Sequence, residues 1–294
     1  MKSVLRGLPF LFALSACEQV IKPDLPEHTP RLVLQAFFTP DSTWAAFVGR
    51  STGILEAMPE REMSVADAEV DLLTGGQVID RLEFFQRERV YMWEKGALQT
   101  GESYSLRVAA PGFATIEATD AIPTPVPTAV VSYLTHTSDR SESRIKGDMS
   151  IKLEIQDPPG ETNYYQIRMF TFFRSELYEG SFTTQDPSII ADNAADEPFN
   201  ESFYTAPFFK DTLFDGQTHQ IELSGNYNAP EHSRFYVQVL YTSETYYEYL
   251  RSSRLHDSAQ DNPFAEPISV YSNVENGYGI FAGYSSQTFE LVLE

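Results

Sequence analysis

MSIKLEI, residues 149–155, alternates apolar and polar side chains without a break. Successive side chains of a β-strand point to opposite faces of a sheet, so this stretch puts a methionine, a leucine and two isoleucines on one face. The pattern is typical of an antiparallel strand with one buried face. The stretch therefore predicts a strand that covers one side of a core.

The same alternation recurs along the chain. It is found in five further stretches, at residues 31–38, 68–72, 104–108, 235–241 and 288–293. The composition agrees, because 16 Tyr and 21 Phe favour strands, while 16 Gly and 18 Pro favour the turns between them. We expect a mainly β protein.

One segment lacks the alternation. Residues 243–257 begin with Ser243, a common N-cap residue, and carry Glu244 in the first turn and Arg251 and Arg254 late, as the helix dipole favours. Helical spacing then places four residues on one side: Tyr246, Tyr249, Leu250 and Ser253. We predict one substantial helix here, packed over the edge or end of a sheet.

A proline-rich segment divides the chain. Pro123, Pro125 and Pro127 cannot donate hydrogen bonds to a sheet and favour an extended, stiff connection. We expect residues 123–127 to join two domains. These are a small β-sandwich over residues 30–122 and a larger one over residues 128–294 that includes the helix.

The first of these domains carries a local resemblance. DAEVDLLTGG (67–76) and GALQTGESYSLRVAAPGFATIEATDAIP (96–123) resemble transthyretin-like and immunoglobulin-like modules. Gly101 and Gly112 would supply turn conformations that a Cβ makes costly. The expected fold class is therefore mainly β, with two sandwiches of this immunoglobulin- or transthyretin-like kind and one substantial helix in the second.

The chain begins with the layout of a secretory signal. Lys2 and Arg6 precede an apolar run over residues 8–14 that is too short to span a bilayer as a helix. Leu14-Ser15-Ala16-Cys17 follows, which resembles a lipobox. Residues 1–16 are thus predicted to be a cleaved signal peptide and Cys17 a lipidation site. The alternative is an ordinary signal peptide with a chance cysteine.

The rest of the chain would then be a globular protein tethered to a membrane. Residues 17–29, with two prolines and several charges, are predicted to be the acylated tether. Loss of residues 1–16 removes two basic residues and no acid, which changes the formal net charge from −21 to −23. This balance argues against nucleic acid and anionic headgroups as partners, because both need a basic face. Cys17 is the only cysteine, so no disulfide can form within the chain.

Several stretches together resemble one family. They are the lipobox, DLPEHTPRLVLQAFFTPDS (24–42), APGFATIEATDAIPTPVP (110–127) and DNPFAEPISVYSNVENGYGIFAGYS (261–285). With them the chain resembles the Bacteroidetes lipoprotein family DUF4249, a domain of unknown function. The resemblance implies a lipoprotein of the Gram-negative outer membrane, on either the periplasmic or the surface face. It also implies an outer-membrane receptor or TonB-dependent transporter as partner, and it implies no established activity.

The most specific of these stretches, residues 261–285, is also the candidate contact surface. Its aromatic rings offer large apolar area at small entropy cost, and its glycines admit a close neighbour, as interface hot spots require. We predict partner or ligand binding by four residues: Tyr271, Tyr278, Phe281 and Tyr284. The alternative is a strand-turn-strand whose rings complete the core.

Catalytic motifs are poor. The five histidines are isolated, none has a metal-ligand spacing such as HExxH, and no GxSxG elbow occurs. We therefore predict a protein that is not an enzyme, with no catalytic residue, cofactor or metal. Acids in residues 186–197, with Asp211 and Asp215, could furnish several of the oxygens that calcium needs, but a solvated polar loop is the preferred interpretation.

Three functions from different classes follow. The preferred one is a non-enzymatic accessory or binding subunit, anchored in the outer membrane beside a TonB-dependent transporter. The second is a surface adhesin or glycan-binding module, which a flat row of exposed rings would favour. The third is a hydrolase, which a pocket with two converging carboxylates would favour.

Overall fold

The computed structural model describes residues 28–292 except 54–55, 57–58, 95–97, 142, 194–203 and 261–265. Cys17, the predicted signal peptide and most of the predicted tether therefore lie outside the described residues. The described chain is mainly β, as expected. None of its helices is long and apolar enough to cross a membrane.

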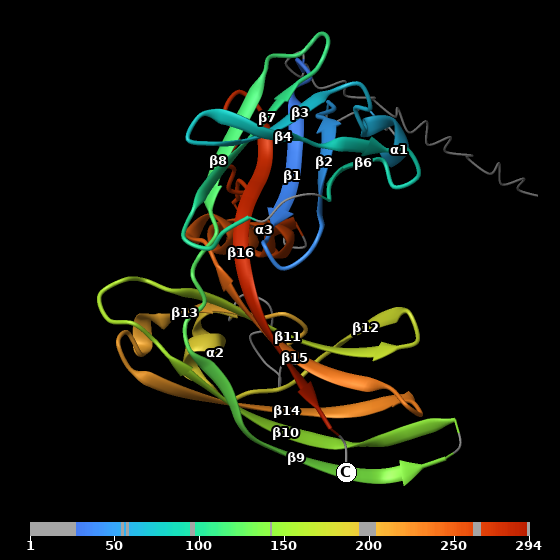
Figure 1. Ribbon diagram of the computed structural model, residues 1–294, viewed down its shortest axis with the longest axis vertical. Helices are drawn as coiled ribbons and strands as arrows, with labels where there is room; N and C mark the ends of the chain where they lie inside the picture. Colours follow the sequence, from blue (N-terminus) through green and yellow to red (C-terminus); the bar gives the residue numbers. More distant parts are fainter. Residues whose placement is uncertain are drawn as a thin grey trace, which may run out of the picture.

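The chain forms two stacked modules, each made of two sheet layers (Figure 1). In the first module one layer consists of β1 (Leu32–Phe38), β2 (Trp44–Arg50), β6 (Val90–Trp93), β5 (Glu83–Phe85) and the first half of β16 (Tyr278–Leu291). The facing layer has the order β4 (Gln77–Arg81), β3 (Glu69–Thr74), β7 (Ser103–Ala109) and β8 (Ile116–Ala121). A short helix, α1 (Glu60–Met63), lies beside them.

The second module repeats the two-layer plan. One layer consists of β12 (Glu176–Gly180), β11 (Tyr164–Phe173), β15 (Arg234–Thr242) and the second half of β16, with β13 (Phe208–Lys210) also paired to β11. The facing layer has the order β14 (Thr218–Pro230), β10 (Arg144–Gln156) and β9 (Thr128–Arg140). The helical elements are α2 (Pro187–Asn193), the 3-10 turn η1 (Asp211–Leu213) and α3 (Glu244–Gln260).

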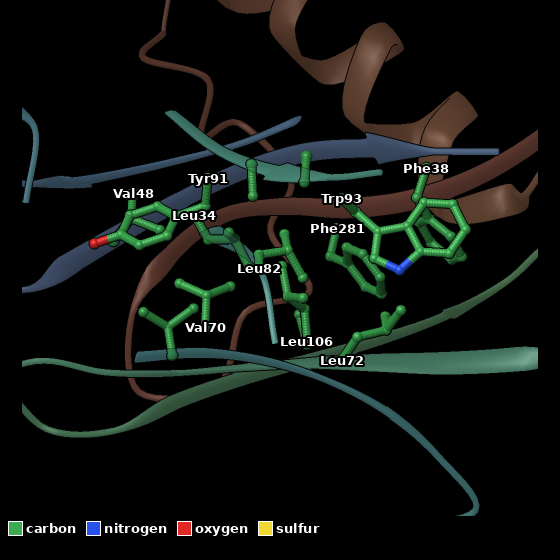
Figure 2. Close-up of a cluster of buried hydrophobic side chains, with 14 of the residues drawn as sticks. Leu34, Phe38, Val48, Val70, Leu72, Leu82, Tyr91, Trp93, Leu106 and Phe281 are labelled. Atoms are coloured by element: carbon green, nitrogen blue, oxygen red, sulfur yellow. The ribbon is translucent and has the colours of Figure 1, made fainter. Parts of the chain in front are cut away.

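Each of the six predicted strands overlaps an observed strand and differs from it by a residue at most at the predicted ends that are described, and MSIKLEI forms the second half of β10. Its four apolar residues are buried in the core of the second module, as the alternation predicts. The core of the first module forms in the same way between its two layers. Figure 2 shows Phe38, Trp93 and Phe281 gathered at one end of that core, with Leu34, Val48 and Tyr91 at the other.

The C-terminal strand belongs to both modules. The first half of β16 pairs in parallel with β1, from Tyr278 opposite Val33 to Gly283 opposite Phe38. Its second half pairs antiparallel with β15. One continuous sheet therefore runs through both modules.

This sharing corrects the assignment of residues 128–294 to a single unit. Val274 and Phe281 pack in the first core, whereas Leu291 packs in the second. Local patterning could not show this, because parallel pairing between β1 and β16 joins residues at opposite ends of the chain. The two cores nevertheless divide near the proline-rich segment, with Ile122 in the first and Val126 in the second.

The predicted helix is α3, and Ser243 caps it, since the Ser243 hydroxyl accepts the amide of Tyr246 at 3.1 Å. The helix lies on the sheet face at the junction rather than over an edge. There Tyr246 packs on Ile280 and Ala282 of β16. The helix also runs to Gln260, beyond the predicted end, so Arg251 and Arg254, which were expected late in the helix, lie in its middle.

Asp120 joins the modules. Its carboxylate, at the end of β8, accepts the amide of Gly283 at 2.8 Å and the hydroxyl of Ser243 at 2.5 Å. One side chain of the first module thus holds both the N-terminus of α3 and the shared strand. Burial raises the pKa of Asp120, while the hydrogen bonds from Ser243 and Gly283 oppose that rise.

Candidate binding cleft

A cleft opens between the two layers of the second module. It has a volume of about 410 Å³ and is walled by residues of β10, β11, β12, β14 and β15. It lies at the end where the β9–β10, β11–β12 and β14–β15 hairpins turn, away from the junction (Figure 1). We call it the distal cleft.

The floor of the distal cleft is apolar. It is formed by four buried side chains: Met149, Met169, Tyr227 and Phe235. Strand alternation places them there, because each lies on the face of its strand that points into the sandwich. Two methionines give this floor flexible side chains that adapt to the shape of a ligand.

The cleft is open because the connection after β12 closes only part of the gap between the layers. Phe182 is fully buried, and Thr183 exchanges two backbone hydrogen bonds with Ser224 of β14, at 2.7 and 2.9 Å. Gly225 permits this close crossing, since a Cβ there would lie 3.1 Å from the Ser181 carbonyl oxygen. Beyond the crossing, β12 and the end of β14 are edge strands of different sheets.

Tyr178 shows that the open part lacks a cover. In the sheet it lies level with Thr171 and Phe235, so its side chain is on the face that points into the sandwich. Tyr178 is nevertheless 47% exposed. The Tyr178 hydroxyl donates to the carboxylate of Glu176, and this bond raises the pKa of the hydroxyl. An interior-facing ring that meets solvent marks the cleft as a place where another molecule can bind.

The rim of the cleft carries one positive charge. Arg144 is exposed at the start of β10, and its Nε and Nη2 donate to the side-chain and backbone oxygens of Asn228, at 2.9 and 2.8 Å. These bonds fix the guanidinium beside the end of β14. With an apolar floor and a few fixed polar groups, the distal cleft has the composition of a ligand site.

A second surface lies on the outer face of the layer that contains β11 and β15. Phe170 and Tyr236 stack there with ring centroids 5.2 Å apart, and Arg234 lies over Tyr236 and Phe172 at 5.9 and 5.6 Å. All three rings are half-buried. We call these four residues the aromatic row. Flat arrays of partly exposed rings suit stacking on a sugar or a peptide.

The predicted contact residues divide between surface and core. Tyr271 and Tyr278 are 39% and 44% exposed, and the guanidinium of Arg31 lies 5.5 Å from the Tyr278 ring centre. Tyr284 is half-buried against Tyr246, with ring centroids 5.9 Å apart. The structure does not bring Tyr271 and Tyr278 into either surface described above.

Phe281 was predicted to contact a partner, and this is wrong. Its side chain has 0% exposure and stacks on Phe38 at 4.1 Å in the first core. The glycines around it serve the same packing. A Cβ on Gly279 would lie 1.8 Å from the Leu34 carbonyl oxygen, and one on Gly283 would lie 2.3 Å from that of Ala121. The close neighbour that these glycines admit is the chain itself.

The acids of the predicted polar loop have structural partners. Asp186 is the N-cap of α2, because it accepts the amide of Ser188 at 3.0 Å, and its other oxygen lies 2.8 Å from Nε2 of His219. Burial raises the pKa of Asp186, but the hydrogen bonds from His219 and Ser188 outweigh burial, so the pKa is lowered. Residues 187–193 are therefore a helix rather than a loop, and residues 194–197 lie outside the described residues.

Asp157, Asp211 and Asp215 converge, with carboxylate oxygens within 4.8 Å of one another. Asp157 and Asp211 are buried, and the carboxylate of Asp157 accepts the amide of Gly216, while that of Asp211 accepts the amide of Asn163. Burial and the two neighbouring carboxylates raise the pKa of Asp211. Three carboxylates of this kind could contribute to a calcium site, which needs six to eight oxygens. They do not line the distal cleft, so they are not the pair of carboxylates in a pocket that would favour the hydrolase.

Sequence reasoning proposed no residue of the distal cleft or the aromatic row as a binding residue. Both surfaces are assembled from strands that are far apart in the sequence, so no local motif marks them. The one local signal was the stretch FTFFRSELY, residues 170–178, where four aromatic residues surround a turn. Side chains of a strand alternate between two faces, so four aromatic residues this close to a turn cannot all lie on one buried face.

Comparisons with known proteins identify the family. The family described as a domain of unknown function, DUF4249, matches residues 18–290, and the chain belongs to it. No curated protein is found to be similar. A crystal structure of a mutant Salmonella alpha-2-macroglobulin is similar at 13% identity, with a TM-score of 0.26. The match covers 79% of this chain and spans only 15% of that one.

Proposed function

We propose that this member of the DUF4249 family is an outer-membrane lipoprotein, anchored through Cys17, that binds a partner without catalysing a reaction. The partner we propose is a TonB-dependent transporter, for which the chain would be an accessory subunit. The observation that carries the binding role is the distal cleft, where an interior-facing tyrosine is left 47% exposed above an apolar floor.

The shape of the chain suits this role. β1, which follows the predicted tether in the sequence, lies in the first module, whereas the residues that line the distal cleft lie near the hairpin turns of the second module. Figure 1 shows these turns at an end of the second module away from the junction. The shared strand β16 and the contacts of Asp120 connect the two modules. A module held in this way presents its cleft in a defined direction, which lowers the entropy cost of binding a partner.

Affinity purification from detergent-solubilised membranes tests the proposal. We expect an outer-membrane receptor to co-purify with the wild-type chain and to be recovered poorly with Tyr178→Ala. Ile79→Ala is the control, because it removes a similarly exposed apolar side chain from β4 of the first module. Equal recovery of the receptor with both variants would remove the cleft from the proposal.

Anchoring is tested separately. Cys17→Ala should abolish palmitate labelling and release most of the protein from the membrane fraction. Unchanged retention in the membrane, with no label on either form, would refute the lipoprotein assignment.

The aromatic row supports a second candidate, a surface glycan-binding module. Rings that stack side by side on a sheet face, with an arginine over them, provide the platform that the faces of sugar rings contact. A glycan array probed with the wild-type chain and with Tyr236→Ala tests this candidate. Signals that are equal for both, or absent from both, would leave the accessory role as the only proposal.

A further inference from the structure

The edge of β14 beside the distal cleft carries backbone groups without a neighbouring strand. Ser224 exchanges both of its backbone hydrogen bonds with Thr183, so its amide and carbonyl point away from β10. In an antiparallel pair the direction of these groups alternates, and therefore those of Asn226 and Asn228 point the same way. Among the described residues no strand pairs with this part of the edge.

One of these groups has a local partner. The Asn228 carbonyl accepts the guanidinium of Arg144 at 2.8 Å. The amide and carbonyl of Asn226 and the amide of Asn228 remain directed at the open edge. They form the donor and acceptor pattern that one further strand would satisfy.

The cleft also provides places for the side chains of such a strand. A strand added to β14 would direct alternate side chains into the sandwich, above Met149 and Met169. The exposed ring of Tyr178 would cover them from the β12 side. The volume of about 410 Å³ accommodates a few side chains rather than a folded domain.

The charge at the rim restricts the ligand further. Arg144 is exposed beside the last residues of β14, and no carboxylate lies within ion-pair distance of it among the described residues. Its hydrogen bonds to Asn228 are to neutral oxygens. A carboxylate on the ligand would give this guanidinium its charge partner.

From these observations we propose that an extended peptide segment of a partner protein adds as a strand to β14 in the distal cleft. It would carry apolar side chains at alternate positions and a carboxylate beside Arg144. This inference rests on the proposed partner-binding role and specifies how the partner is held. An alkyl carboxylate would also suit the floor and the arginine, but it would leave the backbone groups of Asn226 unpaired.

Selection of short random peptides displayed on phage against the full chain tests the inference. We expect selected peptides to alternate apolar and polar residues and to carry an aspartate or glutamate near one end. Asn226→Pro should weaken their binding at least about tenfold, because it removes an edge amide that β10 does not use. Asn226→Thr, which keeps the amide and changes only the side chain, is the matched control and should bind normally.

Two further measurements keep the test decisive if Asn226→Pro does not fold. Methylation of alternate backbone nitrogens of a selected peptide should abolish binding to the wild-type chain. Arg144→Gln should weaken binding of the selected peptide and leave unaffected a variant peptide in which the acidic residue is replaced by its amide, aspartate by asparagine or glutamate by glutamine.

Failure to select any peptide would overturn the inference. So would equal binding of the methylated peptide, or binding of dodecanoate in the cleft where peptides do not bind. The co-purification of a receptor is measured independently, so either proposal can fail while the other stands.

Discussion

Phe281→Ala separates the two interpretations of the C-terminal stretch. The Phe281 ring is fully buried, stacks on Phe38 at 4.1 Å and lies 6.1 Å from the ring of Trp44. Truncation removes this apolar area and leaves a cavity that two large neighbouring rings cannot readily fill. A buried aromatic of this kind contributes ~3–5 kcal/mol to the free energy of unfolding.

The loss should be visible as a lower melting temperature. A change of 3–5 kcal/mol corresponds to a fall of ~6–20 °C for a chain of this size. Urea unfolding, followed by tryptophan fluorescence, gives the free energy directly. Because Trp44 and Trp93 both lie in the first core, the signal reports on the module that contains Phe281.

Tyr278→Ala is the control within the same strand. Its ring is 44% exposed and contacts Arg31 at 5.5 Å, so its loss should lower the free energy of unfolding by no more than ~1 kcal/mol. A Phe281→Ala protein with wild-type stability and impaired partner recovery would refute the assignment of this residue to the core.

Three further outcomes are expected. Gly279→Ala should lower the free energy of unfolding by more than the ~1–2 kcal/mol of its left-handed backbone alone, because the added Cβ would also strike the Leu34 carbonyl, and urea unfolding measures this. Asp211→Asn, measured in EDTA, should raise the free energy of unfolding at neutral pH. The reason is that burial and two nearby carboxylates raise the pKa of Asp211 and so disfavour its ionised form in the folded protein, and a lower free energy of unfolding would contradict this. Asp186 has a lowered pKa, so its contribution to stability is present above the unfolded pKa of ~3.9 and is lost as pH falls through the folded pKa. Asp186→Asn should therefore make the melting temperature fall less steeply as the pH is lowered. An unchanged fall would show that the contact with His219 contributes nothing to stability.

Much of the fold could be predicted because the pattern of apolar and polar residues within a strand or helix depends on which of its faces is buried. MSIKLEI was recognisable as a strand because its side chains alternate between the face of the sheet that is buried in the core and the opposite face. Ser243 marked the start of α3 because an N-cap acts on amides two or three residues away. The four candidate contact residues could not be sorted in this way, since the buried Phe281 and the exposed Tyr278 both lie in one strand of mainly aromatic and small residues.

The sequence by itself determined a mainly β chain with one substantial helix and membership of the DUF4249 family, because these depend on periodicity, capping and motifs within short segments. Only the tertiary structure decided that β16 serves both modules, that Phe281 is buried and that Tyr178 is not. The physical reason is that burial depends on which strands meet. The pairing of β1 with β16 and the gap between β12 and β14 depend on how segments far apart in the sequence are arranged, and the sequence of one segment does not indicate which other segment lies beside it.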